Sequence, residues 1–186
     1  MNVLFSDFDY APFNQIKNSD YLTSIRHGIN ELKSEIDTIL SNKNTTFKNT
    51  IEALDYSGLK LDRITSIFFN INAAETSKEI QDIAVTLSPE LSELKNYILL
   101  NDKLYEKVKT VYNSTDKNDL SKEENTLLKN TYRSFLRNGA SLSNKDKSKL
   151  RKIDVRLSKL SLVATIKMKM PNKSSFSISR TFEIRF

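Results

Sequence analysis

The sequence predicts an all-α fold, an antiparallel helical bundle, and three observations support it. Apolar residues recur at alternating three- and four-residue spacing along most of the chain, which is the period of one face of an α-helix. The 186 residues include only 3 Gly and 3 Pro, so few positions interrupt a helix. Residues suited to capping helix ends stand between the periodic stretches. No segment approaches the roughly 20 apolar residues that span a bilayer, so no membrane partner is expected.

Two amphipathic stretches open the predicted bundle. Ser19 is the expected N-cap of the first, and the polar residues 41–44 end it. Its apolar face comprises Leu22, Ile25, Ile29, Leu32, Ile36 and Ile39. Thr46 is expected to cap a second helix, whose stripe comprises Phe47, Ile51, Leu54, Leu61, Ile64, Phe68 and Ile71. Gly58 lies on that stripe, where a glycine costs helix propensity but permits a neighbouring helix to approach closely.

Two more helices are predicted in the middle of the chain. Thr76 begins the third, with Glu79 three residues later as a capping box, and Pro89 predicts a kink or break within it. Its apolar positions are Ile80, Ile83, Leu87, Leu91, Leu94 and Ile98. Asn101 is expected to cap a shorter helix with Leu104, Val108 and Val111 on its apolar face.

The last two predicted helices have clear start signals. Ser121 and Glu124 form a capping box, and Gly139 stands where a glycine ends a helix. Ser143 is expected to cap the final helix, whose stripe comprises Leu150, Ile153, Leu157 and Leu160. Core packing is expected for the aromatic residues on the helical stripes, namely Phe47, Phe68, Tyr132 and Phe135.

The character of the sequence changes near Leu162, and we place a boundary there. Residues 1–18 are predicted to be an extended lead-in, 19–162 a helical domain and 163–186 an atypical tail that contributes +4 to the net charge of +6. Apolar residues alternate in the tail, at Ile166, Met168, Met170, Phe176, Ile178, Phe182, Ile184 and Phe186. Alternation predicts a β-hairpin, with disorder as the alternative because an isolated hairpin is marginally stable.

Several phrases, in order over about 150 residues, resemble the thimet oligopeptidase family, which includes oligopeptidase A and peptidyl-dipeptidase (dipeptidyl carboxypeptidase). They include APFNQIK at 11–17, TFKNTIEAL at 46–54, YRSF at 132–135 and IDVRLSKLS at 153–161. The resemblance implies the N-terminal fragment of a much longer enzyme that hydrolyses short peptides. It also implies one zinc ion in the full-length family, held by an H-E-x-x-H helix and a later glutamate. Because the match stops near Leu162, the tail is interpreted as out-of-frame sequence.

No catalytic, cofactor-binding or metal-binding residue is predicted in this chain. A zinc hydrolase needs two imidazoles on one helix face and a carboxylate that activates water, whereas the chain has one His and no Cys. His27 falls off its helix's apolar stripe and is expected on the solvent side. Asp7 and Asp9 form a D-x-D without a phosphate-binding loop, so they are read as structural. No G-x-S-x-G elbow is present for a serine nucleophile.

Charge and apolar exposure indicate which partners to expect. Basic residues cluster on the last predicted helix, at Lys145, Lys147, Lys149, Arg151, Lys152, Arg156 and Lys159. No aromatic residue is interleaved for base stacking, so a solvated face is expected rather than a nucleic-acid site. Lys167 and Lys169 of the tail extend the cluster and keep weak nucleic-acid binding open as the alternative. An apolar stripe left uncovered in the fragment predicts self-association. The N-terminus lacks a signal peptide, which predicts a cytoplasmic protein. The alternative function is a non-enzymatic helical interaction module with a partner-binding tail.

Overall fold

The computed structural model describes residues 2–6, 8, 10–116 and 118–169, and every regular element in these ranges is helical. This confirms the all-α prediction. The longer helices are α1 (Asn18–Ser41), α3 (Leu59–Ala74), α4 (Lys78–Leu99), α5 (Asp102–Ser114), α6 (Lys122–Arg137) and α7 (Asn144–Lys169). The short elements are η1 (Val3–Phe5), η2 (Phe13–Gln15), the π-helix η3 (Phe47–Glu52) and α2 (Ala53–Tyr56).

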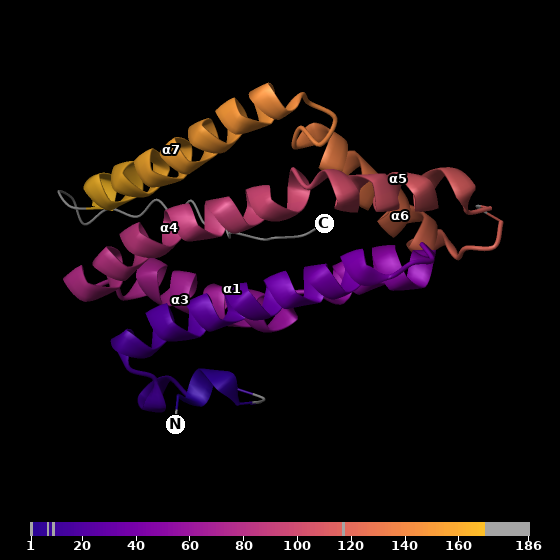
Figure 1. Ribbon diagram of the computed structural model, residues 1–186. Helices are drawn as coiled ribbons and strands as arrows, with labels where there is room; N and C mark the ends of the chain where they lie inside the picture. Colours follow the sequence, from indigo (N-terminus) through magenta and orange to yellow (C-terminus); the bar gives the residue numbers. More distant parts are fainter. Residues whose placement is uncertain (1, 7, 9, 117, 170–186) are drawn as a thin grey trace.

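The long helices lie in layers across the molecule (Figure 1). Helix α1 packs on α3 and α4, and α7 packs on α4 as the outermost layer. Helices α3 and α7 run in the opposite direction to α1 and α4, which gives the antiparallel arrangement (Figure 1). Helices α5 and α6 pair at the end of the molecule where α4 finishes, and η3 contacts both of them.

The hydrophobic core joins α1, α3, α4, α5 and α6, and α7 adds the partly buried Leu162 to it. Fully buried side chains from different elements include Leu4, Ile25, Ile36, Leu54, Ile64, Phe68, Leu87 and Phe135. Their positions on α1, α3, α4 and α6 are those of the predicted apolar stripes. Burying each such side chain contributes about 1.5–3 kcal/mol relative to leaving it in water, so the stripes supply the main force that assembles the bundle.

The N-terminal lead-in is not extended, contrary to the prediction. It contains the two 3-10 turns η1 and η2, and the side chain of Leu4 in η1 is completely buried against α1. Asn2 fixes this segment, because its Nδ2 donates to the Ser24 Oγ of α1 at 2.7 Å. Ser19 is not the N-cap: that position is Lys17, two residues earlier, and the Asp20 carboxylate accepts from the N–H of Lys17 at 2.9 Å.

The single helix predicted after Thr46 is three elements. Thr46 caps it as expected, with its hydroxyl accepting from the N–H of Asn49 at 3.2 Å. Gly58 then interrupts the helix with a φ of 78°, so that η3 and α2 precede the break and α3 follows it. The close approach expected at Gly58 is also present, because a Cβ there would lie 3.1 Å from Leu32 Cδ2 of α1.

Most of the other predicted caps are confirmed, with two differences. Asn101 and the capping box of Ser121 and Glu124 begin α5 and α6. At the start of α4, however, Ser77 rather than Thr76 is the N-cap, because its hydroxyl accepts from the N–H of Ile80 at 3.2 Å. Pro89 does not end α4, which continues through it to Leu99.

Helix α7 extends further than the sequence indicated. Ser143 begins it, accepting from the N–H of Asp146 at 3.2 Å, and the helix continues across Leu162 to Lys169. Ile166 and Met168 therefore belong to a helix and not to the first strand of a hairpin. The remainder of the predicted hairpin, from Met170 onward, lies outside the described residues, and the proposed boundary at Leu162 does not coincide with a helix end.

Candidate functional site

His27 is a surface residue of α1, as its position off the stripe predicted. Its side chain is 51% exposed, and Nε2 lies 3.3 Å from Glu31 Oε1 one helical turn later. The imidazole also forms a T-shaped contact with the Phe5 ring, with centroids 4.8 Å apart. In the part of the chain that the structure describes, no three His, Cys, Asp or Glu side chains gather where they could hold a metal ion. Asp7 and Asp9 lie outside that part.

The aromatic residues singled out in the sequence belong to the core. Phe68 and Phe135 are fully buried, and Phe47 and Tyr132 are partly buried against the same cluster. Tyr132 stacks on Tyr112 of α5 with ring centroids 4.1 Å apart. These contacts join α5 to α6, so the aromatic residues have a structural explanation and form no separate site.

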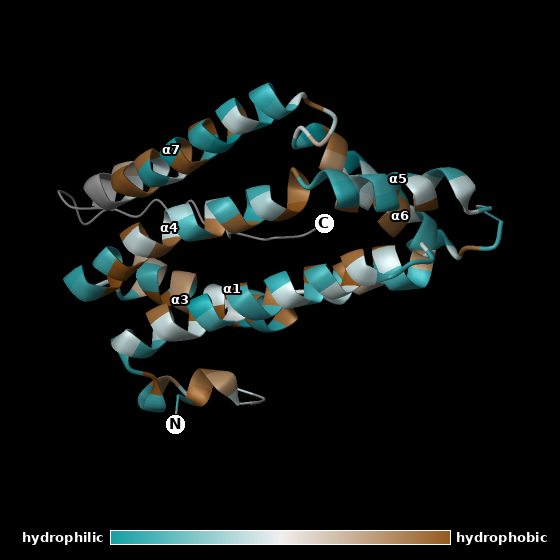
Figure 2. Ribbon diagram, in the orientation of Figure 1, coloured by the Kyte–Doolittle hydropathy of each residue, from teal (hydrophilic) through white to brown (hydrophobic). Residues whose placement is uncertain are grey.

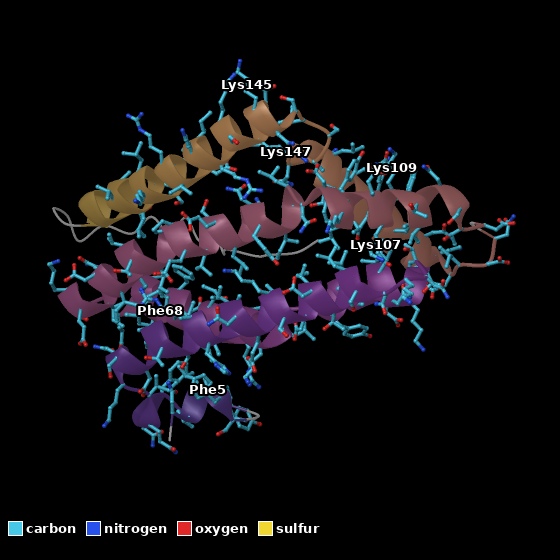
Figure 3. The ribbon with its side chains drawn as sticks, in the orientation of Figure 1. Phe5, Phe68, Lys107, Lys109, Lys145 and Lys147 are labelled. Carbon is cyan, nitrogen blue, oxygen red and sulfur yellow. The ribbon has the colours of Figure 1, made fainter. Side chains whose placement is uncertain are left out.

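The basic residues of the α7 cluster do not all have the same surroundings. Lys145 lies on the outer side of the helix, whereas Lys147 lies toward α5 (Figure 3). Lys147 is only 4% exposed, and its ammonium group forms an ion pair with the Asp102 carboxylate in the first turn of α5. The expectation of a uniformly solvated basic face is therefore wrong at Lys147, because α5 brings a carboxylate to it.

Arg151, Lys152, Arg156 and Lys159, from the same cluster, line a cleft between α7, α4 and α1. The cleft has a volume of about 900 Å³. Ile29 and Leu94 contribute apolar surface to it, and Asn96 contributes a buried amide. Sequence patterns do not predict this cleft, because its lining comes from three helices that are distant in the chain.

The apolar stripe of α7 faces solvent. Its exposed members are Ile153 at 59%, Leu157 at 60%, Leu160 at 56% and Val163 at 39%. The side chains of α7 with reduced exposure include Lys147, Asp154, Ser158 and Leu162, on a face roughly a third of a turn away. Hydrophobic segments recur along α7 between hydrophilic ones (Figure 2). An exposed stripe of this length is typical of a surface that another polypeptide covers.

Curated proteins similar to this chain are peptidases. Dipeptidyl carboxypeptidase of Escherichia coli (strain K12) is 34% identical over 163 residues, which are 87% of this chain and 24% of the relative. The protein of the same name from Salmonella typhimurium is 34% identical over 140 residues, 75% of this chain and 21% of the relative. The chain belongs to the dipeptidyl carboxypeptidase and oligopeptidase A family. Oligopeptidase A of Haemophilus influenzae is 27% identical over 149 residues, 80% of this chain and 22% of that protein.

This oligopeptidase-family chain spans about a quarter of the length of the curated relatives it matches, or less. The match confirms the resemblance read from the sequence. No family model matches the chain. Within the described residues, no helix is both long and apolar enough to traverse a lipid bilayer.

Proposed function

We propose that this chain is the N-terminal helical portion of a zinc-dependent oligopeptidase or peptidyl-dipeptidase, and that it is catalytically inactive by itself. The family role would be the hydrolysis of short peptides in the cytoplasm, with one zinc ion in the full-length enzyme. The observation that supports inactivity is the donor set. A catalytic zinc site of the H-E-x-x-H type requires two histidines, and this chain contains only His27 and no cysteine.

The surroundings of His27 also do not fit a zinc site. Glu31 is its acidic neighbour, but two side chains are fewer than the three protein ligands of a catalytic zinc site. Glu31 is also engaged by Lys60, whose Nζ lies 3.0 Å from the same Oε1. No step of peptide hydrolysis can therefore be assigned to this part of the molecule, and zinc chemistry would have to reside in sequence beyond it.

In this proposal the exposed stripe of α7 is an interface. In a protein of the relatives' length it would be covered by sequence beyond this chain. In the chain by itself, we propose that the stripe pairs with that of a second copy. Helix α7 carries many more basic than acidic residues, so two copies repel one another electrostatically. Self-association should therefore strengthen as salt screens this repulsion.

A peptidase assay tests the inactivity. The purified chain, incubated with zinc and a fluorogenic short peptide, should give no cleavage above that of zinc buffer. Full-length Escherichia coli dipeptidyl carboxypeptidase on the same peptide is the positive control. Cleavage that a chelator abolishes but that persists in His27→Ala would show a metal site formed by residues other than His27. Cleavage that is lost in His27→Ala would assign the peptidase activity to His27. Either result would overturn the proposal.

The DNA provides an independent test of the truncation. The coding region and the sequence downstream would be read in all frames. We expect a downstream frame that encodes an H-E-x-x-H helix, with the family sequence resuming after the position of Leu162. Absence of such a helix in every frame would favour the second candidate, a self-standing interaction module.

A further inference from the structure

The cleft between α1, α4 and α7 is strongly basic. Six cationic side chains line it, namely Arg26, Lys33, Arg151, Lys152, Arg156 and Lys159. Glu90 and Glu93 are the acidic residues of the lining. Arg26 and Glu90 engage one another, with the guanidinium Nη2 donating at 2.6 Å and Nε at 3.0 Å. This bidentate contact raises the pKa of Arg26, and the two charges neutralise one another.

The four cations that α7 contributes to the cleft are not engaged in the way that Arg26 is. Among the described residues, Arg151, Lys152, Arg156 and Lys159 form no ion pair. Four positive charges on one wall, opposed by the single carboxylate of Glu93, attract an anionic ligand. Charge alone would describe any lysine-rich surface, so the choice of ligand depends on the other groups of the lining.

Asn96 supplies the second observation. The residue is only 6% exposed and lines the cleft, yet its Nδ2 has no hydrogen-bond partner among the described residues. A buried amide N–H₂ that lacks an acceptor is costly, and buried polar groups are satisfied in the great majority of cases. Nδ2 itself is closed off from solvent, so the side chain has to turn toward the cleft before a ligand's carbonyl or carboxylate oxygen can accept from it and remove this cost.

The remaining surfaces favour a peptide over a nucleic acid. Ile29, Leu94 and Val155 give the cleft an apolar surface suited to aliphatic side chains. Tyr97 is the aromatic residue of the lining, but its hydroxyl donates to Asp37 at 3.1 Å and the Lys33 ammonium lies 5.6 Å from its ring centroid. The cleft lining therefore offers one aromatic ring with a cation near one of its faces, a weaker platform than the series of rings on which the bases of a single strand stack.

We propose that this cleft is a docking site for an acidic, partly apolar segment of another polypeptide. The segment's carboxylates pair with the α7 cations, aliphatic side chains contact Ile29 and Leu94, and a backbone carbonyl accepts from Asn96 Nδ2 once the Asn96 side chain has turned toward the cleft. Backbone carbonyls occur at every residue of an extended peptide, so one can reach Asn96 while alternate side chains point to the basic wall. The proposal depends on the contacts of these three helices and not on any peptidase activity.

Fluorescence anisotropy with the full chain tests the proposal. The probe is a fluorescein-labelled peptide of about eight residues that alternates Glu and Leu. A matched peptide with Gln in place of Glu, and a labelled single-stranded RNA of the same length, serve as comparisons. The Glu peptide should bind with a Kd below about 1 mM that rises with salt, and more tightly than either comparison.

Matched variants locate the binding. Arg151→Glu with Arg156→Glu should weaken it at least about tenfold, because both exposed side chains line the cleft. Lys129→Glu with Lys145→Glu changes the net charge equally at exposed positions outside the cleft and should change the Kd less than about twofold. Asn96→Leu should weaken binding about fivefold without lowering the unfolding midpoint.

Four results would overturn the proposal. They are no binding of the Glu peptide up to about 1 mM, equal binding of the Gln peptide, tighter binding of the RNA, or equal losses in the two double variants. Equal losses would mean that the whole basic surface, and not the cleft, attracts the peptide.

Discussion

Lys147 of α7 is almost wholly buried and its ammonium group pairs with the carboxylate of Asp102, which is 67% exposed in the first turn of α5. The aliphatic part of the lysine is thus packed while its charge reaches a partner at the surface. This pair ties α7 to the end of the bundle formed by α5 and α6 (Figure 3).

Packing of the Lys147 stem should matter more than its charge. Lys147→Ala is expected to lower the free energy of unfolding by about 2 kcal/mol, because it removes buried methylene groups. Lys147→Met keeps most of that volume and loses the ion pair with a largely exposed carboxylate, so it should cost under about 1 kcal/mol. Chemical denaturation of both variants measures the difference. Equal losses would show that the charge dominates.

Gly139 should not tolerate a side chain. Its φ is 90°, and the N–H of Ala140 bonds to the carbonyl of Phe135 at 3.0 Å, as in a Schellman motif that ends α6. A Cβ at position 139 would also lie 2.8 Å from side-chain carbons of Leu142 and Leu150. Gly139→Ala should therefore cost about 1–2 kcal/mol. Asn130→Ala, at an exposed position of the same helix, should stay within about 0.5 kcal/mol in the same thermal or chemical unfolding experiment.

Asp146 should contribute a pH-dependent term to stability. The Ser143 hydroxyl donates to its carboxylate at 2.8 Å and Lys149 Nζ lies 3.1 Å away, and these contacts lower the pKa of Asp146 below its usual 3.8. Because the folded pKa is the lower one, the stabilisation is present above about pH 4 and is lost as the pH falls through the folded pKa.

NMR titration of the side-chain carbons measures this pKa directly. Ser143→Ala should raise the Asp146 pKa toward its usual value, since the hydroxyl is the largest cause of the shift. Asp146→Asn should flatten the fall in unfolding free energy on acidification. A wild-type Asp146 that titrates at or above 3.8 would contradict the assigned contacts.

The proposed self-association should depend on the exposed stripe of α7. Leu157→Gln replaces a side chain that is 60% exposed, so it should weaken dimerisation several-fold while leaving the unfolding midpoint of the monomer nearly unchanged. Leu59→Gln is the matched control, since Leu59 is 57% exposed at the start of α3. Sedimentation over a range of protein and salt concentrations measures both. A concentration-independent monomer, or equal effects of the two substitutions, would argue against the α7 interface.

Some structural details could not be read from the sequence because they depend on a neighbour. The sequence around Gly28 does not predict its role, yet a Cβ there would lie 3.1–3.3 Å from three atoms of Leu61, so this glycine lets α1 and α3 approach. The sequence likewise contains no feature that predicts the burial of Asn96. Its burial and its unpartnered amide arise only when α1 and α7 come together beside α4.

What the sequence by itself determined is the helical fold, most of the caps and the family, because periodicity, capping chemistry and ordered phrases are local properties of the chain. The single histidine likewise followed from the composition. Only the tertiary structure decided which apolar stripes are core. Those of α1 and α4 are buried, but the equally regular stripe of Ile153, Leu157 and Leu160 is exposed. The physical reason is that a period of 3.6 residues shows which face of a helix is apolar, whereas burial also requires a partner to cover that face.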